Sequence, residues 1–122
     1  MSMQTIRVIG ELNGLGSFLL PIMENNLNNP ERWKGLKQIK GSLVATERDS
    51  SVSITIFFDN GNIQLQSGTI DKPSASLTSD FDTVAAYSCG ELNPIVGVLK
   101  GKISVRGNLL KLLKMVKLVR SD

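Results

Sequence analysis

Cys89 is the residue of this chain best suited to nucleophilic chemistry, and the sequence supplies no partner for it. A catalytic thiolate is normally activated by a neighbouring histidine, but the chain contains no histidine. The same absence removes a Ser-His-Asp triad and leaves a transition-metal site almost without ligands, because Cys89 is also the single cysteine. We interpret Cys89 as a buried structural thiol. The prediction is a protein that is not an enzyme and uses no metal or other cofactor.

Two other motifs have the composition of a site but are better explained by structure. Asp80 and Asp82 could form a carboxylate pair, yet a cap and a first-turn acid at the start of a helix explain both. Residues 14–16, Gly-Leu-Gly, have no expected strand before them and no Gly-Lys-Ser/Thr after them, so they are not a phosphate-binding loop. Neither motif predicts chemistry.

The basic residues are concentrated at one end of the chain. Residues 100–122 carry seven basic side chains and one acidic side chain, a net charge of +6, whereas residues 1–99 have a net charge of −3. Such a segment indicates a local anionic partner or a solvated surface. Nucleic acid is not the predicted partner, because the segment has no aromatic side chain for base stacking and its lysines are interleaved with leucines.

The length of 122 residues is typical of one domain, and no linker or repeat divides residues 1–122. A membrane-spanning helix needs about 20 apolar residues, and no segment reaches that length. Arg7, Gly10 and Glu11 interrupt the N-terminal segment, so it lacks the apolar centre of a secretory signal. We expect a soluble, cytoplasmic domain.

The elements that must position any site begin with helices. Apolar residues recur at three- and four-residue steps over residues 12–23, which predicts an amphipathic helix. Pro21 leaves two alternatives open, because proline disrupts a helix interior: the helix begins near Phe18, or it is kinked at Pro21. The pair Asn29-Pro30 then predicts the start of a short second helix.

An alternation of apolar and polar residues follows from residue 42 onward. It predicts three strands in an antiparallel meander, with a hairpin turn at Asn60-Gly61. Residues 71–80 contain a fourth strand, which precedes a helix, and residues 103–106 form a fifth. Helices at both ends of an antiparallel sheet predict the α+β class.

The last predicted helix carries more apolar residues than one contact face requires. Most of its apolar residues between Leu109 and Val119 fall within an arc of about 160°, while Leu110 and Leu118 lie outside that arc, among the lysines. Two interpretations are open. The helix packs across the sheet as core, or part of its apolar arc faces a ligand cavity, with the lysines around the mouth attracting anionic head groups or membrane lipids.

The segment "LNPIVGVLKGKISVRGNLLKLLKMVKLV" resembles the C-terminal signature of the sterol carrier protein domain, also called the sterol-binding or nonspecific lipid-transfer domain. The family pattern has Asn-Pro, then Gly-Lys, then Gly-Asn or Gly-Asp, followed by an apolar helix. Here the pairs are Asn93-Pro94, Gly101-Lys102 and Gly107-Asn108, separated by six and four residues. The preceding "ASLTSDFDTVAAYSCGE" is similar to the strand, acidic turn and helix of the family. The chain ends "VRSD" rather than in a peroxisomal Ser-Lys-Leu signal, as in a stand-alone bacterial or archaeal member.

The resemblance implies a mostly antiparallel five-stranded sheet flanked by N-terminal and C-terminal helices, with an apolar tunnel between sheet and helices. The implied ligand is an apolar small molecule or lipid, such as a fatty acid, an acyl chain or a sterol-like molecule. From the lysines of the last helix we expect a further partner, an anionic membrane surface. The resemblance maps the tunnel wall onto eight residues: Val98, Leu99, Ile103, Val105, Leu109, Leu112, Leu113 and Val116. To these we add Ile54 and Ile56, from the apolar side of the second strand, and a basic rim of Lys111, Lys114 and Lys117.

Leu110 and Leu112 stand where members of this family often have small residues, so a filled tunnel is the alternative. The chain would then be an accessory or dimerisation module that uses exposed apolar surface of its last helix to form a homodimer or to dock on an enzyme of lipid metabolism. A lipid carrier is the preferred hypothesis.

Overall fold

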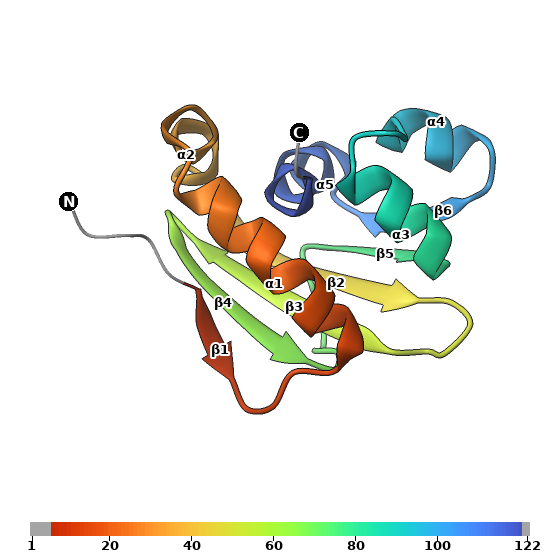
Figure 1. Ribbon diagram of the computed structural model, residues 1–122, viewed down its shortest axis with the longest axis horizontal. Coiled ribbons are helices and arrows are strands. Elements are labelled where there is room, and N and C mark those ends of the chain that lie inside the picture. Colours follow the sequence, from red (N-terminus) through yellow and green to blue (C-terminus); the bar gives the residue numbers. More distant parts are fainter. Residues whose placement is uncertain (1–5, 121–122) are drawn as a thin grey trace.

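The computed structural model describes residues 6–120 as one sheet with its helices gathered on one face (Figure 1). The strands are β1 (Arg7–Ile9), β2 (Lys40–Glu47), β3 (Ser53–Asp59), β4 (Asn62–Ser67), β5 (Ala75–Ser79) and β6 (Ile103–Gly107). The helices are α1 (Gly14–Leu27), α2 (Pro30–Leu36), α3 (Phe81–Ser88), α4 (Pro94–Leu99) and α5 (Leu109–Met115), which continues as the 3₁₀ turn η1 (Val116–Val119). This arrangement confirms the α+β class.

The sheet has six strands and is mixed, so the prediction of five mostly antiparallel strands is wrong in both number and direction. The strand order is β1-β4-β3-β2-β5-β6. The meander of β2, β3 and β4 is antiparallel, as predicted, and β6 is antiparallel to β5, but β1 pairs with β4 and β5 pairs with β2 in parallel.

Both errors have a physical origin. The three residues of β1 are all exposed, so the strand has no buried face and leaves no alternation in the sequence. The connection 68–74 leads from β4 past β3 and β2 to β5, and the periodicity of a strand does not encode the direction of its neighbour. Strand β1 therefore precedes Gly14, although we expected no strand before residues 14–16. These three residues form the first turn of α1.

Helix α1 begins at Gly14, so the alternative start near Phe18 is wrong. The side-chain oxygen of Asn13 accepts a hydrogen bond from the N–H of Gly16 (2.9 Å) and caps the first turn. The helix runs through Pro21, which lies on its exposed side. The proline removes one backbone hydrogen bond there, and burial of the opposite side of α1, including Leu19 and Met23, offsets that cost.

Leu118 lies in the core rather than among the lysines. The α-helical turns end at Met115, and the tighter 3₁₀ turn of η1 advances each residue by about 120° instead of 100°. Leu118 becomes completely buried as a result. Leu110, the second residue of α5, stays exposed as expected.

Candidate ligand-binding site

An apolar cavity of about 320 Å³ lies between the helical face of the sheet and the helices α1, α3, α4 and α5. The apolar faces of β5 and β6 form its floor, where Leu77 and Val105 occupy paired positions in the register of the two strands. The inner side of α5 and η1 covers it with Leu112 and Val116, both of which are buried. The cavity therefore occupies the place that the sequence assigns to a tunnel between sheet and last helix.

The structure brings together nine of the ten residues predicted for the tunnel wall. These are Ile56, Val98, Leu99, Ile103, Val105, Leu109, Leu112, Leu113 and Val116. Ile54 does not line the cavity, because α1 covers it: its Cγ2 lies 3.5 Å from the position that a Cβ on Gly16 would take. Ligand binding by these residues stays a prediction.

Several lining residues come from two helices that the predicted tunnel wall did not include. Leu15 and Leu19 reach the cavity from α1, and Val84 and Tyr87 reach it from α3. Helical periodicity predicted the amphipathic helix over residues 12–23, but the same periodicity is produced by a core and by a cavity wall.

The cavity opens between α4 and the first turn of α5. Three of its lining residues are also among the most exposed apolar side chains: Leu99 is 80% exposed, Ile95 55% and Leu109 51%. At the other end, Leu43 and Leu112 are buried. An apolar molecule could thus enter between Leu99 and Leu109 and reach a closed inner wall.

No charged residue lies among the described residues that line the cavity. Two of the hydroxyl groups that line it are hydrogen-bonded: Tyr87 Oη donates to the carbonyl of Val116 (2.7 Å), and Thr46 Oγ1 lies 2.7 Å from Ser53 Oγ. A ligand inside would meet almost only hydrocarbon. The site can hold an apolar chain, but no charged side chain among its described lining residues could bind a polar group of the ligand inside it.

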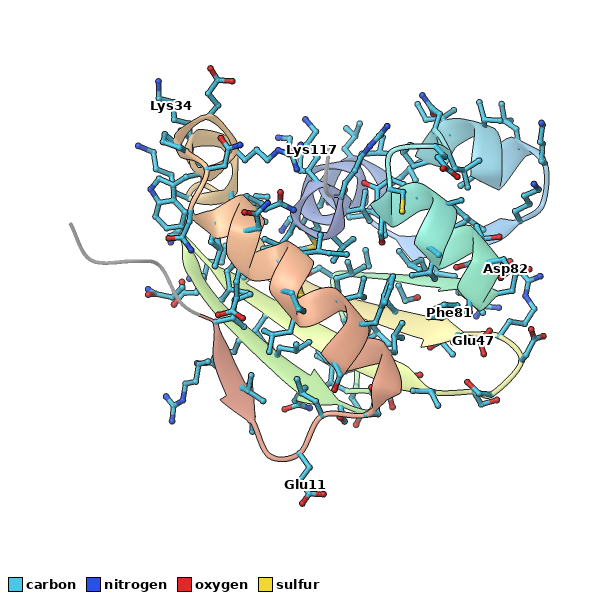
Figure 2. All side chains as sticks on the ribbon, in the orientation of Figure 1. Glu11, Lys34, Glu47, Phe81, Asp82 and Lys117 are labelled. Atoms are coloured by element: carbon cyan, nitrogen blue, oxygen red, sulfur yellow. The ribbon has the colours of Figure 1, made fainter. Side chains whose placement is uncertain are left out.

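The three predicted rim lysines do not surround the mouth of the cavity. Lys111, Lys114 and Lys117 line a second, open hollow of about 1060 Å³ on the other side of α5, between α5 and α2. Figure 2 places Lys117 on the side of this segment turned away from the sheet. Lys111 Nζ donates to the carbonyl of Lys40 (2.8 Å), which ties α5 to the start of β2. We call this second depression the basic hollow.

The residues that first suggested chemistry have structural roles or none. Cys89 is exposed at the end of α3, so its expected burial is wrong. Asp80 caps α3 by accepting the N–H of Thr83 (2.8 Å), and hydrogen bonds from the Thr83 side chain and backbone lower the pKa of its carboxyl. Figure 2 shows Asp82 beside Phe81 at the start of this helix. Within residues 6–120 no group of three potential ligands is placed to hold a metal ion.

Solved structures with the same fold include sterol carrier protein domains. The sterol carrier protein domain 2 of Helicoverpa armigera has a TM-score of 0.69 at 19% identity, covering 89% of this chain and 91% of that chain. The "UbiJ-SCP2 Ubiquinone synthesis protein" has a TM-score of 0.70 at 9% identity, covering 85% and 90%. Palmitated SCP2L2 from Aedes aegypti has a TM-score of 0.54 at 15% identity, covering 67% and 74%.

The chain belongs to the SCP-2 sterol transfer family, whose family model matches residues 22–120. This confirms the resemblance seen in the C-terminal segment. A search of curated proteins gives no match. No helix within residues 6–120 is long and apolar enough to cross a bilayer, since the longest, α1, has 14 residues.

Proposed function

We propose that this protein is a non-enzymatic lipid carrier that holds an acyl chain in the cavity beneath α5. The observation that carries the proposal is the cavity itself, which has an apolar wall, no charged side chain among its described lining residues, and a mouth between α4 and α5. Membership of a family of lipid-transfer domains supports the same function. The proposed place of action is the cytoplasm, and the proposal includes no catalytic step.

The size of the cavity favours a single chain over a larger ligand. Small-molecule sites usually measure about 300–1,000 Å³, and the 320 Å³ found here is at the lower end of that range. A fatty acid or another single acyl chain therefore fits the proposal better than a sterol-like molecule. The palmitated domain from Aedes aegypti, which shares the fold, supports this choice.

The proposal also assigns an orientation to the ligand. A carboxylate is costly to bury without a partner, and the inner wall near Leu43 and Leu112 provides none. The apolar end of the chain would lie against this wall, and the polar head would remain at the mouth, near Leu99 and Leu109.

Displacement of a fluorescent fatty acid, together with mass spectrometry of an organic extract of the purified protein, tests the function. Leu113 lines the cavity, so Leu113→Lys would place a charge against the bound chain and is expected to weaken probe binding by at least about tenfold. Leu110→Lys is the matched control, because it makes the same change on the same helix outside the cavity. Equal effects of the two substitutions, with both variants folded, would contradict binding in this cavity.

An accessory role is the second candidate function. It is favoured by the exposed Leu99, Leu109 and Leu110, and by the fold shared with a ubiquinone synthesis protein. In this alternative the chain would dimerise or dock on an enzyme of lipid metabolism, and lipid would not enter the cavity. Absence of extracted lipid and of probe binding, together with a concentration-dependent dimer in ultracentrifugation, would support it over the carrier.

A further inference from the structure

Helix α5 separates the apolar cavity from the basic hollow, and both open along the same edge of the molecule. Figure 1 places α2, α5 and α4 along this edge, and Figure 2 shows Lys34 of α2 and Lys117 on it. The basic hollow lies between α2 and α5, and the mouth of the cavity lies between α5 and α4. The two depressions therefore belong to one continuous surface.

Apolar and basic side chains alternate along this surface. Leu110 is 75% exposed and lies on the wall of the basic hollow rather than in the cavity, and Leu99 and Leu109 protrude at the mouth. Lys114 and Lys117 are exposed beside them. We call the surface formed by these five side chains the docking face.

The charge of the basic hollow is strongly one-sided. Among the described residues that line it, Glu31 is the single acidic one, against six basic ones. These are Arg32, Lys40, Lys111, Lys114, Lys117 and Arg120. A surface of this kind attracts anions and falls in affinity as salt is added.

We propose that the docking face binds an anionic lipid membrane, with the mouth of the cavity turned toward the bilayer. The inference rests on the proposed carrier function and names the partner with which the carrier exchanges its ligand. Leu99, Leu109 and Leu110 enter the boundary between head groups and acyl chains, while the lysines contact the lipid phosphates.

The interleaving of lysine with leucine favours a membrane over a protein partner. Lysine is depleted from the cores of protein interfaces, where a strongly hydrated ammonium would have to be dehydrated. At a membrane, the stems of Lys114 and Lys117 can lie along the apolar boundary while the ammonium groups stay at the level of the head groups. An acyl chain could then move between bilayer and cavity past Leu99 and Leu109 without crossing water.

Sedimentation with vesicles tests the docking face. Wild-type protein is expected to bind vesicles of phosphatidylcholine with phosphatidylglycerol and to release them when salt is raised. A single basic residue near an anionic surface changes binding by about fivefold, so the double substitution Lys114→Glu/Lys117→Glu is expected to weaken binding by at least about 30-fold. Arg7→Glu/Lys72→Glu is the matched control, because it changes the net charge equally at exposed positions that line neither depression.

A second variant tests the apolar part of the contact. Leu110→Ser is expected to weaken vesicle binding by about tenfold, whereas Ile9→Ser, at an exposed position on β1, is expected to have little effect. Equal weakening by the two charge pairs overturns the proposal, because net charge alone would then explain binding. Failure of the wild-type chain to bind anionic vesicles also overturns it, whether or not the chain pairs with a protein instead.

Probe binding measured on the same samples separates this proposal from the carrier function. A chain that binds the fluorescent fatty acid but no vesicles refutes the docking face alone. A chain that binds vesicles through Lys114 and Lys117 but takes up no fatty acid refutes the carrier alone.

Discussion

The two sides of the helical layer cover the sheet in different ways. On one side, which we call the α1 side, the 14-residue helix α1 lies along β3 and β4 (Figure 1), and Ile54 and Leu65 beneath it are completely buried. On the cavity side, α3, α4 and α5 have only six to eight residues each and surround β5 and β6. Leu77 and Val105 there face a cavity. The long helix α1 covers the strands beneath it with a packed core, whereas the three short helices around β5 and β6 leave a cavity between themselves and the sheet.

The cavity side is held at its edges rather than through its centre. Tyr87 Oη donates to the carbonyl of Val116, and Asn26 Nδ2 donates to the carbonyl of Arg120 (2.8 Å), so both bonds fix η1. Gly107 packs its backbone against Ser74 at the entrance to α5. Side-chain packing around Ile54 and Leu65 therefore holds the α1 side, whereas hydrogen bonds and a close backbone contact hold the edges of the cavity side.

The largest expected difference is between Ile54→Ala and Ile103→Ala. Ile54 is completely buried on the α1 side, so its truncation leaves a void and should lower the free energy of unfolding by about 2–5 kcal/mol. Ile103 is partly exposed and already lines a cavity, so the same change should cost less than about 1.5 kcal/mol. Urea unfolding measures both values, and equal losses would remove the distinction between the two sides.

Gly107→Ala tests whether the close backbone contact at the edge of the cavity side stabilises the fold. Gly107 has φ +90°, and a Cβ there would lie 2.5 Å from the backbone oxygen of Ser74. The expected loss is about 2–3 kcal/mol, which combines the conformational strain with the displacement of backbone.

Gly101→Ala is the matched control for that substitution. Gly101 has φ +75°, but no atom lies within 4 Å of the position that its Cβ would take. Strain alone should cost about 1–2 kcal/mol. A loss as large as that of Gly107→Ala, in the same urea titration, would mean that the contact with Ser74 is unimportant.

Tyr87→Phe should produce a smaller effect on the same side. The substitution keeps the ring, over which the guanidinium of Arg120 lies 5.5 Å from the centroid, and removes the hydroxyl that donates to Val116. Loss of this buried hydrogen bond is expected to cost about 1 kcal/mol. Hydrogen exchange should speed up in η1 but not in α1, and uniform acceleration in both would contradict an edge-specific role.

The smallest expected effect concerns pH and the start of α3. Hydrogen bonds from Thr83 lower the pKa of the Asp80 carboxyl from its usual 3.8. Its pKa is therefore lower in the folded than in the unfolded chain, so ionised Asp80 stabilises the fold above about pH 4. This contribution is lost as the pH falls through the folded pKa.

Asp80→Asn is expected to keep the cap and flatten the acid limb of the melting-temperature profile, because asparagine caps a helix about as well as aspartate. Asp82→Asn is the matched control, since it removes the same charge from the same turn without altering the cap. An unchanged acid limb in Asp80→Asn, with the cap retained, would show that another carboxyl is responsible. Glu47 is the next candidate, because hydrogen bonds from the Asp49 backbone and the Ser50 side chain lower its pKa.

The sequence correctly predicted the elements whose residues show a local pattern, either the alternation of a strand or the cap of a helix. The five strands β2 to β6 follow from alternation, and the caps Asn29 and Asp80 mark helix starts. It missed β1, which has no buried face, and the burial of Leu118, which depends on a change of helix type after Met115. Neither the presence of β1 nor the burial of Leu118 can be recognised from a local pattern of apolar residues.

The candidate site, too, could be predicted only in part from the sequence. Fixed distances between the Asn-Pro, Gly-Lys and Gly-Asn pairs identified the family and, through it, eight residues that the structure places around the cavity, and strand alternation added a ninth, Ile56. Those distances could not show that the lysines face α2 instead of the mouth. A lysine on α5 lies on one flank or the other according to how the helix is rotated against the sheet, and that rotation is set by tertiary packing.

The sequence by itself therefore determined the strands β2 to β6, the family and the helical character of the last segment, because these depend on residue type and spacing along the chain. Tertiary structure alone decided that Ile54 is core while Ile103 lines a cavity. Both are isoleucines that point toward the helical face of the same sheet. What distinguishes them is the length and placement of the helices above, and contacts between distant segments fix that placement.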